Sequence, residues 1–381
     1  MPGFLADVDL TPNQLERARQ RAAAYIDLTS SNPTHHGLLF PADILREAAA
    51  AYWDSRRYEP DPRGQLAARR AIAADYARRT PALEVSPDDI FITASTSEAY
   101  SLLFTLLTEP GDNVLGPNIT YPLFEHLAAA HHIHMRKYEL AASPEGWRIN
   151  EASLVAAAND RTRAVLIISP HNPTGMIIQR PIPALRRLGL PIICDEVFAA
   201  FTYRVPATPP LGTLHPELPV FHLNGISKRF ALPDLKLGWI ALNKPAAEAF
   251  GARLEILNDA FLSANALTQF MLPTLFERGQ AFVAAMQRRF RASLTMAIDL
   301  LERAPNVTVQ PPDGGYYLFP QVTGWDDEEA LALYLLEQGV LVHPGYFYGG
   351  ELGVARIMLS CLIEPSQLRT GLETLTRAIC R

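Results

Sequence analysis

The sequence predicts an α/β fold: a large domain with a mostly parallel β-sheet sandwiched by helices, and a smaller α+β domain. Three almost uninterrupted apolar runs carry this prediction, at 164–169, 191–194 and 219–224. Such runs are typical of parallel strands that are covered on both faces. Helical patterns near 151–158 and 183–188 fit the crossovers that parallel strands require.

The length of the chain indicates two domains. It has 381 residues, 48% of them hydrophobic, which is enough for more than one core. After Trp239 the alternation of strands and helices gives way to a long helical pattern over roughly 244–303. We expect an N-terminal segment at 1–44 that joins the small domain, a large domain at 45–243 and a small C-terminal domain at 244–381.

Composition argues against several classes of partner. The net charge of −6, without a clustered Lys/Arg tract, gives no surface for nucleic acid. Neither a basic, then apolar N-terminal signal nor a membrane-length apolar run is found, so we expect a cytoplasmic protein without membrane contact. Cys194, Cys361 and Cys380 are not spaced as metal ligands and fit a reducing compartment.

The first quarter of the chain alternates helical patterns with breaks. A polar helical pattern at 11–25 precedes a turn-rich loop at 26–37, which cannot be a regular helix. An Ala-rich helix is expected at 41–56 and another at about 65–79. The sequence Tyr-Glu-Pro-Asp-Pro-Arg-Gly at 58–64 separates these two helices.

A short strand and a helix start form the next unit. β-Branched and aromatic residues at 90–93 indicate the strand, and Ser95 with Glu98 forms a capping box that opens a helix. Free N–H groups and small hydroxyl residues at a helix start attract anions. A helix cap without any ligand would use the same residues.

Polar residues follow the three apolar runs. Asn172 follows the first run, in Pro-His-Asn-Pro-Thr-Gly at 170–175, and Asp195 ends the second. A buried carboxylate needs a cationic partner, although an aspartate here could also simply cap a helix. Lys228 follows the third run, where burial can keep its amine neutral enough to attack a carbonyl. Open α/β sheets place ligands at such strand ends.

The stretch at 222–239, with Ser227-Lys228 and a Gly-Trp ending, resembles the lysine signature of the class I/II aminotransferases. These are pyridoxal-phosphate enzymes of fold type I. The Asn-Pro-Thr-Gly at 172–175 and the strand-end Asp195 match further motifs in the family's order. The resemblance runs from about residue 26 to the C-terminus and implies pyridoxal 5'-phosphate held as a Schiff base on Lys228.

The resemblance also implies roles for other residues. Asp195 would keep the pyridine nitrogen charged, and Asn172 would contact the phenolic oxygen and the substrate carboxylate. Tyr121 would stack on the ring, and Tyr58 would reach the cofactor of the other subunit of a homodimer. Arg356 would clamp the substrate α-carboxylate through a bidentate pair. The remaining cofactor contacts, on the phosphate side, would be Thr96, Ser97, Ser227 and Lys236.

Four positions depart from the family pattern. Phe198 stands where a tyrosine is usual, Gly225 replaces a serine, Asp234 a glycine and Lys236 an arginine. Since lysine lacks the guanidinium fork, phosphate binding at that corner is expected to be weaker or differently shaped.

Three functions remain open from sequence. The first is a transaminase that moves an amino group between an L-α-amino acid and a 2-oxo acid. A lyase of the same fold, such as a carbon–sulfur β-lyase, would use the identical residues. A non-catalytic protein that binds the cofactor is less consistent with the complete set of Lys228, Asp195, Asn172 and Arg356. The substrate itself is not readable from the sequence.

Overall fold

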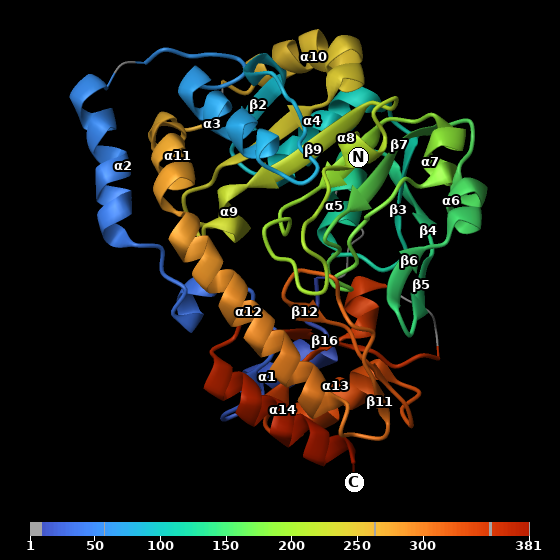
Figure 1. Ribbon diagram of the computed structural model, residues 1–381. Coiled ribbons are helices and arrows are strands. Elements are labelled where there is room, and N and C mark those ends of the chain that lie inside the picture. The colour runs from blue at the N-terminus through green and yellow to red at the C-terminus, as the bar shows by residue number, and fades with distance from the viewer. Residues whose placement is uncertain (1–9, 57, 263, 350–352, 381) are drawn as a thin grey trace.

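The computed structural model describes residues 10–56, 58–262, 264–349 and 353–380. The chain forms two bodies, and the larger lies above the smaller in Figure 1, with the C-terminus at the bottom. Residues 1–9 of the expected N-terminal segment lie outside the described part. No described helix is both long and apolar enough to cross a bilayer.

Within the described residues, seven strands form the central sheet of the larger body. Six of them run parallel, and only β10 is antiparallel to its neighbours, which confirms the expected fold class. In spatial order they are β2 (Ile90–Thr93), β10 (Gly238–Leu242), β9 (Val220–Gly225), β8 (Ile192–Asp195), β7 (Thr162–Ile168), β3 (Asn113–Pro117) and β4 (His134–Tyr138).

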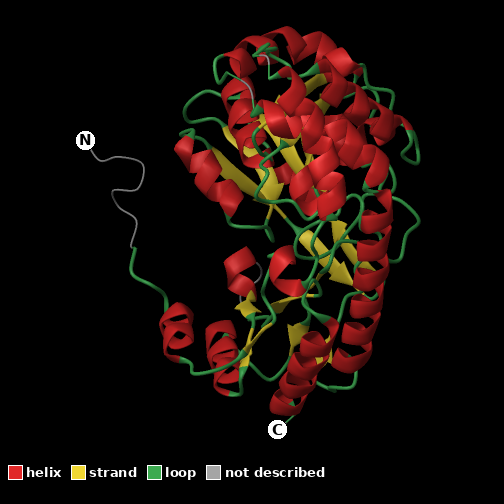
Figure 2. Cartoon of the chain, turned by 90° about the vertical axis from the view of Figure 1, so that its left-hand side faces the viewer, coloured by secondary structure: helices red, strands yellow, loops and turns green. Residues whose placement is uncertain are grey.

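Helices cover both faces of this sheet, as Figure 2 shows. Leu166 of β7 packs in the cluster that contains residues of α4, α5 and α10, whereas its neighbour Ile167 packs in a cluster with residues of α6, α7 and α8. Successive residues of a strand face opposite sides, so both sides of β7 must be apolar. The bounds are α4 (Thr96–Leu107), α5 (Leu123–Ala130), α6 (Glu151–Ala157), α7 (Pro183–Leu188), α8 (Leu211–Leu214) and α10 (Lys244–Asp259).

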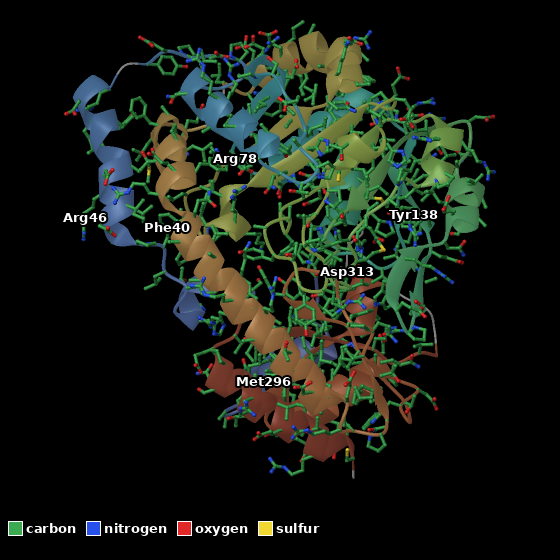
Figure 3. All side chains as sticks on the ribbon, viewed as in Figure 1. Phe40, Arg46, Arg78, Tyr138, Met296 and Asp313 are labelled. Atoms are coloured by element: carbon green, nitrogen blue, oxygen red, sulfur yellow. The ribbon has the colours of Figure 1, made fainter. Side chains whose placement is uncertain are left out.

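Side chains fill the layers of the larger body (Figure 3). Tyr138, at the end of edge strand β4, is buried, and its hydroxyl donates to the carbonyl oxygen of Leu166 at 2.9 Å. A third cluster joins α2 (Ala42–Ser55), α3 (Leu66–Ala77) and α11 (Ala266–Arg278) beside β2 and β10.

The helical pattern expected over 244–303 is three helices, α10, α11 and α12 (Gln280–Leu301). The chain turns between α11 and α12 at Gly279. A Cβ there would lie 2.5 Å from the carbonyl oxygen of Leu275 and 3.0 Å from the ring of Phe230. The residue at this turn must therefore be small.

Helix α12 passes from one body into the other. Val283 packs in the cluster of α2, α3 and α11, whereas Leu294 and Leu301 pack in the core of the smaller body. Helices α10 and α11, which follow the expected boundary at residue 244, pack with the larger body.

The smaller body combines the N-terminal segment with the C-terminal part of the chain. β1 (Ile26–Asp27) pairs in parallel with β14 (Val340–Leu341), and a three-stranded sheet has the order β12, β16, β15. The other elements are α1 (Gln14–Arg21), β11 (Val307–Thr308), β12 (Tyr317–Leu318), β13 (Gln321–Val322), α13 (Glu328–Glu337), β15 (His343–Pro344), η3 (Gly345–Tyr348), β16 (Ile357–Ser360) and α14 (Pro365–Ile379).

Candidate active site

The carboxyl ends of three neighbouring strands, β7, β8 and β9, open into one cavity of about 470 Å³. Most of the residues expected at the site line it, and two, Tyr58 and Arg356, do not. Those that line it are Thr96, Ser97, Tyr121, Asn172, Asp195, Ser227, Lys228 and Lys236.

Adjacent parallel strands bring the three central residues together. Asp195 is the last residue of β8 and pairs with Ile168 of β7 and Leu223 of β9. Asn172 follows β7, and Lys228 lies in α9 (Ile226–Arg229), the short helix directly after β9. The ends of parallel strands meet at one edge of a sheet, which is where open α/β sheets bind ligands.

Lys228 has the environment of a reactive amine. Burial lowers its pKa, and the nearby Asp195 carboxylate opposes this shift in part. Its Nζ atom lies 5.9 Å from the centre of the Phe198 ring, which is itself buried. A lower pKa leaves more of the amine neutral, as attack on a carbonyl requires.

Asp195 is buried, and no described lysine or arginine forms a salt bridge with it. Burial is the main cause that raises its pKa to about 6. Two donors oppose that shift: the backbone N–H of Val197, 3.0 Å from Oδ1, and the hydroxyl of Tyr100, 2.9 Å from Oδ2. A buried carboxylate of this kind is suited to a cationic ligand.

Tyr100 was missed by the sequence analysis. It lies on α4, is 1% exposed, and lines the cavity. The signal available in the sequence was a tyrosine within an amphipathic helix, because a buried tyrosine hydroxyl needs a partner. The sequence does not reveal that the partner would be Asp195, 95 residues further along the chain.

The neighbouring carboxylate of Glu196 has a different environment. Arg79 donates to it at 2.5 Å, the His222 ring lies 2.8 Å away, and Tyr76 donates at 3.2 Å. Burial alone would raise its pKa, but Arg79 and His222 outweigh burial and lower the pKa to about 2. Glu196 therefore anchors the end of β8, which leaves Asp195 to face the cavity.

The start of α4 provides an anion-binding end of the cavity. Ser95 caps this helix, since its Oγ accepts from the N–H of Glu98 at 3.2 Å. A Cβ on Gly238 would lie 2.9 Å from the backbone nitrogen of Thr96, so β10 packs tightly against this helix start. The same cavity is lined by Thr96, Ser97, Ser227 and Lys236, whose hydroxyl and ammonium groups are suited to an anion.

The side chains of Asn172 and Tyr121 leave groups available to a ligand. Asn172 Oδ1 is buried and has no hydrogen-bond partner among the described residues. Tyr121 lines the cavity yet is 46% exposed, so part of its ring remains uncovered. Tyr58 lies between α2 and α3, is 77% exposed, and does not contact this cavity within the chain.

Arg356 is not among the residues that line the cavity, and its role as the carboxylate clamp stays a prediction. Its guanidinium lies 4.8 Å from the centre of the Trp147 ring and donates to Gln310 Oε1 at 3.0 Å. Met358, two positions further along, lines the cavity instead. Residues two apart on a strand share a face and are about 6.6 Å apart. Arg356 therefore lies on the same face as Met358, next to the cavity lining.

Four residues on the small-domain side of the cavity were not predicted. Tyr317, His343, Tyr348 and Met358 line it, and the hydroxyls of Thr29 and Ser31 come from the N-terminal segment. His343 Nδ1 is 3.1 Å from the Tyr348 hydroxyl, and burial lowers the pKa of this histidine.

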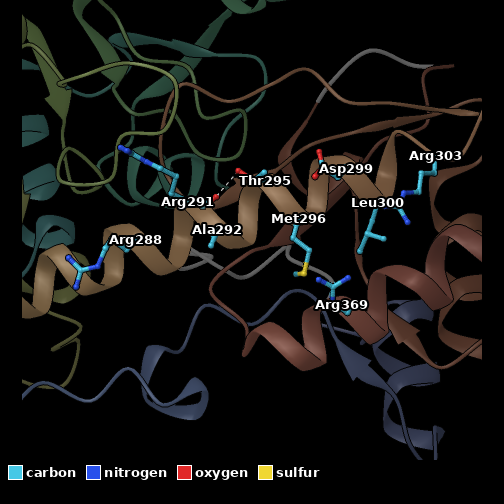
Figure 4. A pocket seen from close by; sticks show the side chains of 9 residues that line it. All are labelled: Arg288, Arg291, Ala292, Thr295, Met296, Asp299, Leu300, Arg303 and Arg369. Carbon is cyan, nitrogen blue, oxygen red and sulfur yellow. Dashed lines mark hydrogen bonds between the residues drawn. The ribbon is translucent and has the colours of Figure 1, made fainter.

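A second hollow, of about 570 Å³, lies between α12 and α14 (Figure 4). Its arginines include Arg288, Arg291 and Arg369, and Arg291 donates to the carbonyl oxygen of Thr202 at 3.3 Å. None of the expected site residues lines this hollow. The candidate active site is therefore the smaller cavity at the strand ends.

The model of the family "aminotransferase class I and II" matches residues 23–375. The chain belongs to this family. Class I and II aminotransferases use pyridoxal 5'-phosphate, and this aminotransferase is accordingly a transaminase that depends on that cofactor.

Individual relatives support the same conclusion. Nicotianamine aminotransferase 1 of Oryza sativa subsp. japonica is 27% identical over 341 residues, 84% of this chain and 67% of that protein. S-alkyl-thiohydroximate lyase SUR1 of Arabidopsis thaliana is 29% identical over 274 residues, 68% of this chain and 58% of that protein. The fold matches that of alanine aminotransferase from Pyrococcus furiosus with a TM-score of 0.87 at 23% identity, covering 96% and 94% of the two chains.

The cavity of this aminotransferase fits the cofactor. Among the described residues no lysine or arginine forms a salt bridge with the buried Asp195, and a pyridinium nitrogen would supply a cation there. Asn172 has a buried oxygen without a partner among the described residues, and Lys228 has a lowered pKa. The hydroxyl groups and helix start at Thr96 and Ser97 offer donors to a phosphate.

Proposed function

We propose that Lys228 binds the cofactor covalently and that this site transfers an amino group between an L-α-amino acid and a 2-oxo acid. The observation that carries the proposal is the convergence of Lys228, Asp195 and Asn172 at three adjacent strand ends in one cavity. Burial gives each of these side chains an unusual property: Lys228 has a lowered pKa, Asp195 a raised pKa, and Asn172 a buried oxygen that has no partner among the described residues.

Each residue has a distinct task in this proposal. When bound, the cofactor supplies a ring that accepts electrons from the substrate's Cα. Asp195 holds the ring nitrogen in its protonated form, and Asn172 positions the phenolic oxygen. Lys228, once displaced by the substrate amine, removes the Cα proton and returns it. Tyr121 covers one face of the ring.

The phosphate of the cofactor is proposed to bind at the start of α4. Thr96 and Ser97 offer backbone N–H groups and hydroxyls, and Ser227 adds a third hydroxyl. Lys236 contributes a positive charge without the bidentate geometry of an arginine. The helix dipole favours the anion at the same place.

A cytoplasmic homodimer is the second part of the proposal. Large apolar side chains near α2, α3 and α10 are exposed in the single chain and would be covered in a dimer. They are Leu39, Trp53, Tyr58, Leu66, Phe261 and Leu262. Tyr58 would then complete the site of the other subunit. The three cysteines, all free, are consistent with a reducing compartment.

A carbon–sulfur lyase is the second candidate function. The similarity to S-alkyl-thiohydroximate lyase SUR1 favours keeping it, because lyases of this fold use the same site residues. The two reactions differ in what they require and release. A transaminase requires a 2-oxo acid, to which it passes the amino group, whereas the lyase releases a thiol and requires no 2-oxo acid. A panel of donors with and without a 2-oxo acid separates them.

Covalent labelling tests the central proposal. The purified protein, loaded with pyridoxal 5'-phosphate, is reduced with borohydride and digested, and the modified peptide is identified by mass. We expect the label on the peptide that contains Lys228, and we expect Lys228→Ala to take up none. Label on another lysine would refute the assignment.

A further inference from the structure

A smaller hollow of about 240 Å³ adjoins the active-site cavity on the small-domain side. Thr29 and His343 line both spaces, so these two side chains lie between them. The other walls of the hollow come from α1, β1, β14 and η3. A long substrate side chain that passes Thr29 and His343 would enter this hollow.

The carboxylate of Asp27, which lines the hollow, is held beside this passage. Its Oδ1 atom accepts from the backbone N–H of Thr29 at 2.8 Å and from the Thr29 hydroxyl at 2.6 Å. Ile26 and Leu28, its neighbours in the chain, pack in the core of the smaller body. Asp27 therefore faces away from that core and towards the hollow.

The charged side chains on the described lining leave the hollow negative. Glu16 and Arg19 neutralise each other, because Arg19 donates to both carboxylate oxygens of Glu16 at 2.7 Å. No described lysine, arginine or histidine forms a salt bridge with Asp27, and its described hydrogen bonds use Oδ1, not Oδ2. Burial lowers the pKa of His343, so this ring adds no charge near neutral pH.

We propose that this hollow is a subsite for the side chain of the amino donor, and that Asp27 selects donors whose side chain ends in a cation. The substrate class is α-amino acids with a long side chain and a terminal guanidinium or ammonium group. In the transfer, the donor's α-CH–NH₂ becomes C=O and the acceptor's C=O becomes CH–NH₂, while the terminal cation is unchanged. The proposal rests on the function proposed above, since the same site must hold the cofactor.

The chemistry of Asp27 supports this class. An ionised carboxylate only accepts hydrogen bonds, and a guanidinium presents five N–H donors. Charge-assisted hydrogen bonds of this kind are roughly twice as strong as those between neutral groups. A neutral side chain of the same length would gain less, and a side chain that ends in a carboxylate would meet a like charge.

Two stable conjugates test the subsite by binding. The Schiff bases of pyridoxal 5'-phosphate with L-arginine and with L-citrulline are reduced with borohydride, and each product is titrated into the cofactor-free protein in a calorimeter. L-citrulline has a neutral ureido group in place of the guanidinium, so the ratio of the two dissociation constants reports the terminal charge. We expect the arginine conjugate to bind at least about tenfold more tightly. Single-turnover reactions of the loaded enzyme with the two free amino acids should show the same preference.

Substitution of Asp27 tests the assignment to this residue. Asp27→Asn removes the charge but keeps the size and an acceptor for Thr29, and it should reduce the ratio to within about threefold. Asp299→Asn is the matched control, because it removes the same charge from the hollow between α12 and α14 and should leave the ratio unchanged. If Asp27→Asn does not fold, Asp27→Thr, which is also suited to a strand, makes the same comparison.

Two results would overturn the subsite. One is equal binding of both conjugates by wild type, and the other is a ratio in the Asp27 variant as large as in wild type. Borohydride labelling of Lys228 separates the two proposals. A wild type that takes up no label and binds neither conjugate refutes the cofactor assignment, whereas a labelled enzyme that treats both donors alike refutes only the subsite.

Discussion

The hydroxyl of Tyr100 donates to Asp195 Oδ2 at 2.9 Å, between helix α4 and the end of strand β8. Both side chains are buried, and burial raises the pKa of each. This hydrogen bond stabilises the ionised carboxylate, which is the form that can pair with a pyridinium nitrogen.

Removing this hydroxyl should weaken cofactor binding. Tyr100→Phe leaves Asp195 with one donor fewer, so its ionised form costs more and the dissociation constant for pyridoxal 5'-phosphate should rise by roughly tenfold. Equilibrium dialysis of the cofactor measures this effect. Tyr138→Phe is the matched control, because that buried hydroxyl donates to the carbonyl of Leu166 and not to Asp195. Equal losses in both variants would contradict the assignment.

The buried charge of Asp195 should lower the free energy of unfolding of the cofactor-free protein as the pH rises. Its folded pKa of about 6 exceeds the ordinary value of 3.8, so the folded state binds more protons between these values and loses stability as pH rises. Asp195→Asn removes this term. From pH 4 to pH 8 the free energy of unfolding of the variant should gain up to about 3 kcal/mol relative to wild type.

Urea titrations of both cofactor-free proteins at several pH values test this expectation. The comparison between the two proteins cancels the titration of groups that they share, including Glu196. If the stability difference between the two proteins does not change with pH, the pKa of Asp195 is not raised in the folded state.

Because Phe198 has no hydroxyl, the phenolic oxygen of the cofactor should receive one hydrogen bond fewer than in family members that have a tyrosine at this position. Its ring lies 5.9 Å from Lys228 Nζ. Phe198→Tyr adds a donor, which stabilises the phenolate and should lower the pKa of the cofactor–lysine chromophore by roughly one unit. A spectral pH titration measures it. Phe201→Tyr is a control, since Phe201 packs against Phe290 away from the cavity lining. An unchanged or higher pKa in Phe198→Tyr would mean that another donor serves this oxygen.

Sites completed across a dimer interface should allow complementation. Each proposed site takes Lys228 from one subunit and Tyr58 from the other. A mixed dimer of Tyr58→Ala and Lys228→Ala subunits therefore contains one site in which both residues are intact. Random mixing should restore about a quarter of the wild-type sites. Asp195→Asn mixed with Lys228→Ala is the control, because both residues serve the same subunit and no intact site forms. A protein that sediments only as a monomer would exclude the arrangement.

The strand ends of the site were predictable because their signals are local. Asn172, Asp195 and Lys228 each follow an apolar run, and parallel neighbours necessarily bring such ends together. The helix cap at Ser95 was also readable, since capping depends on residues within one turn.

Longer-range features were not readable. Arg356 and Met358 share a strand face, so the sequence pattern does not tell which of them reaches the cavity. The contact of Tyr100 with Asp195 joins two distant elements. The passage of α12 between two cores was hidden because a helix that crosses between cores has the same periodicity as one that stays in a single core.

Helix α12 has a consequence for how the cavity can open. It is unbroken over 22 residues, about 33 Å, with no proline or glycine between Gln280 and Leu301. One end packs with the body that carries Lys228, and the other packs with the body that carries Met358. Helix α12 therefore links the wall that carries the reacting amine to the opposite wall, and the turn at Gly279 lies at its start. Substitutions in this helix can then change the turnover rate even though the substituted residues do not contact the substrate.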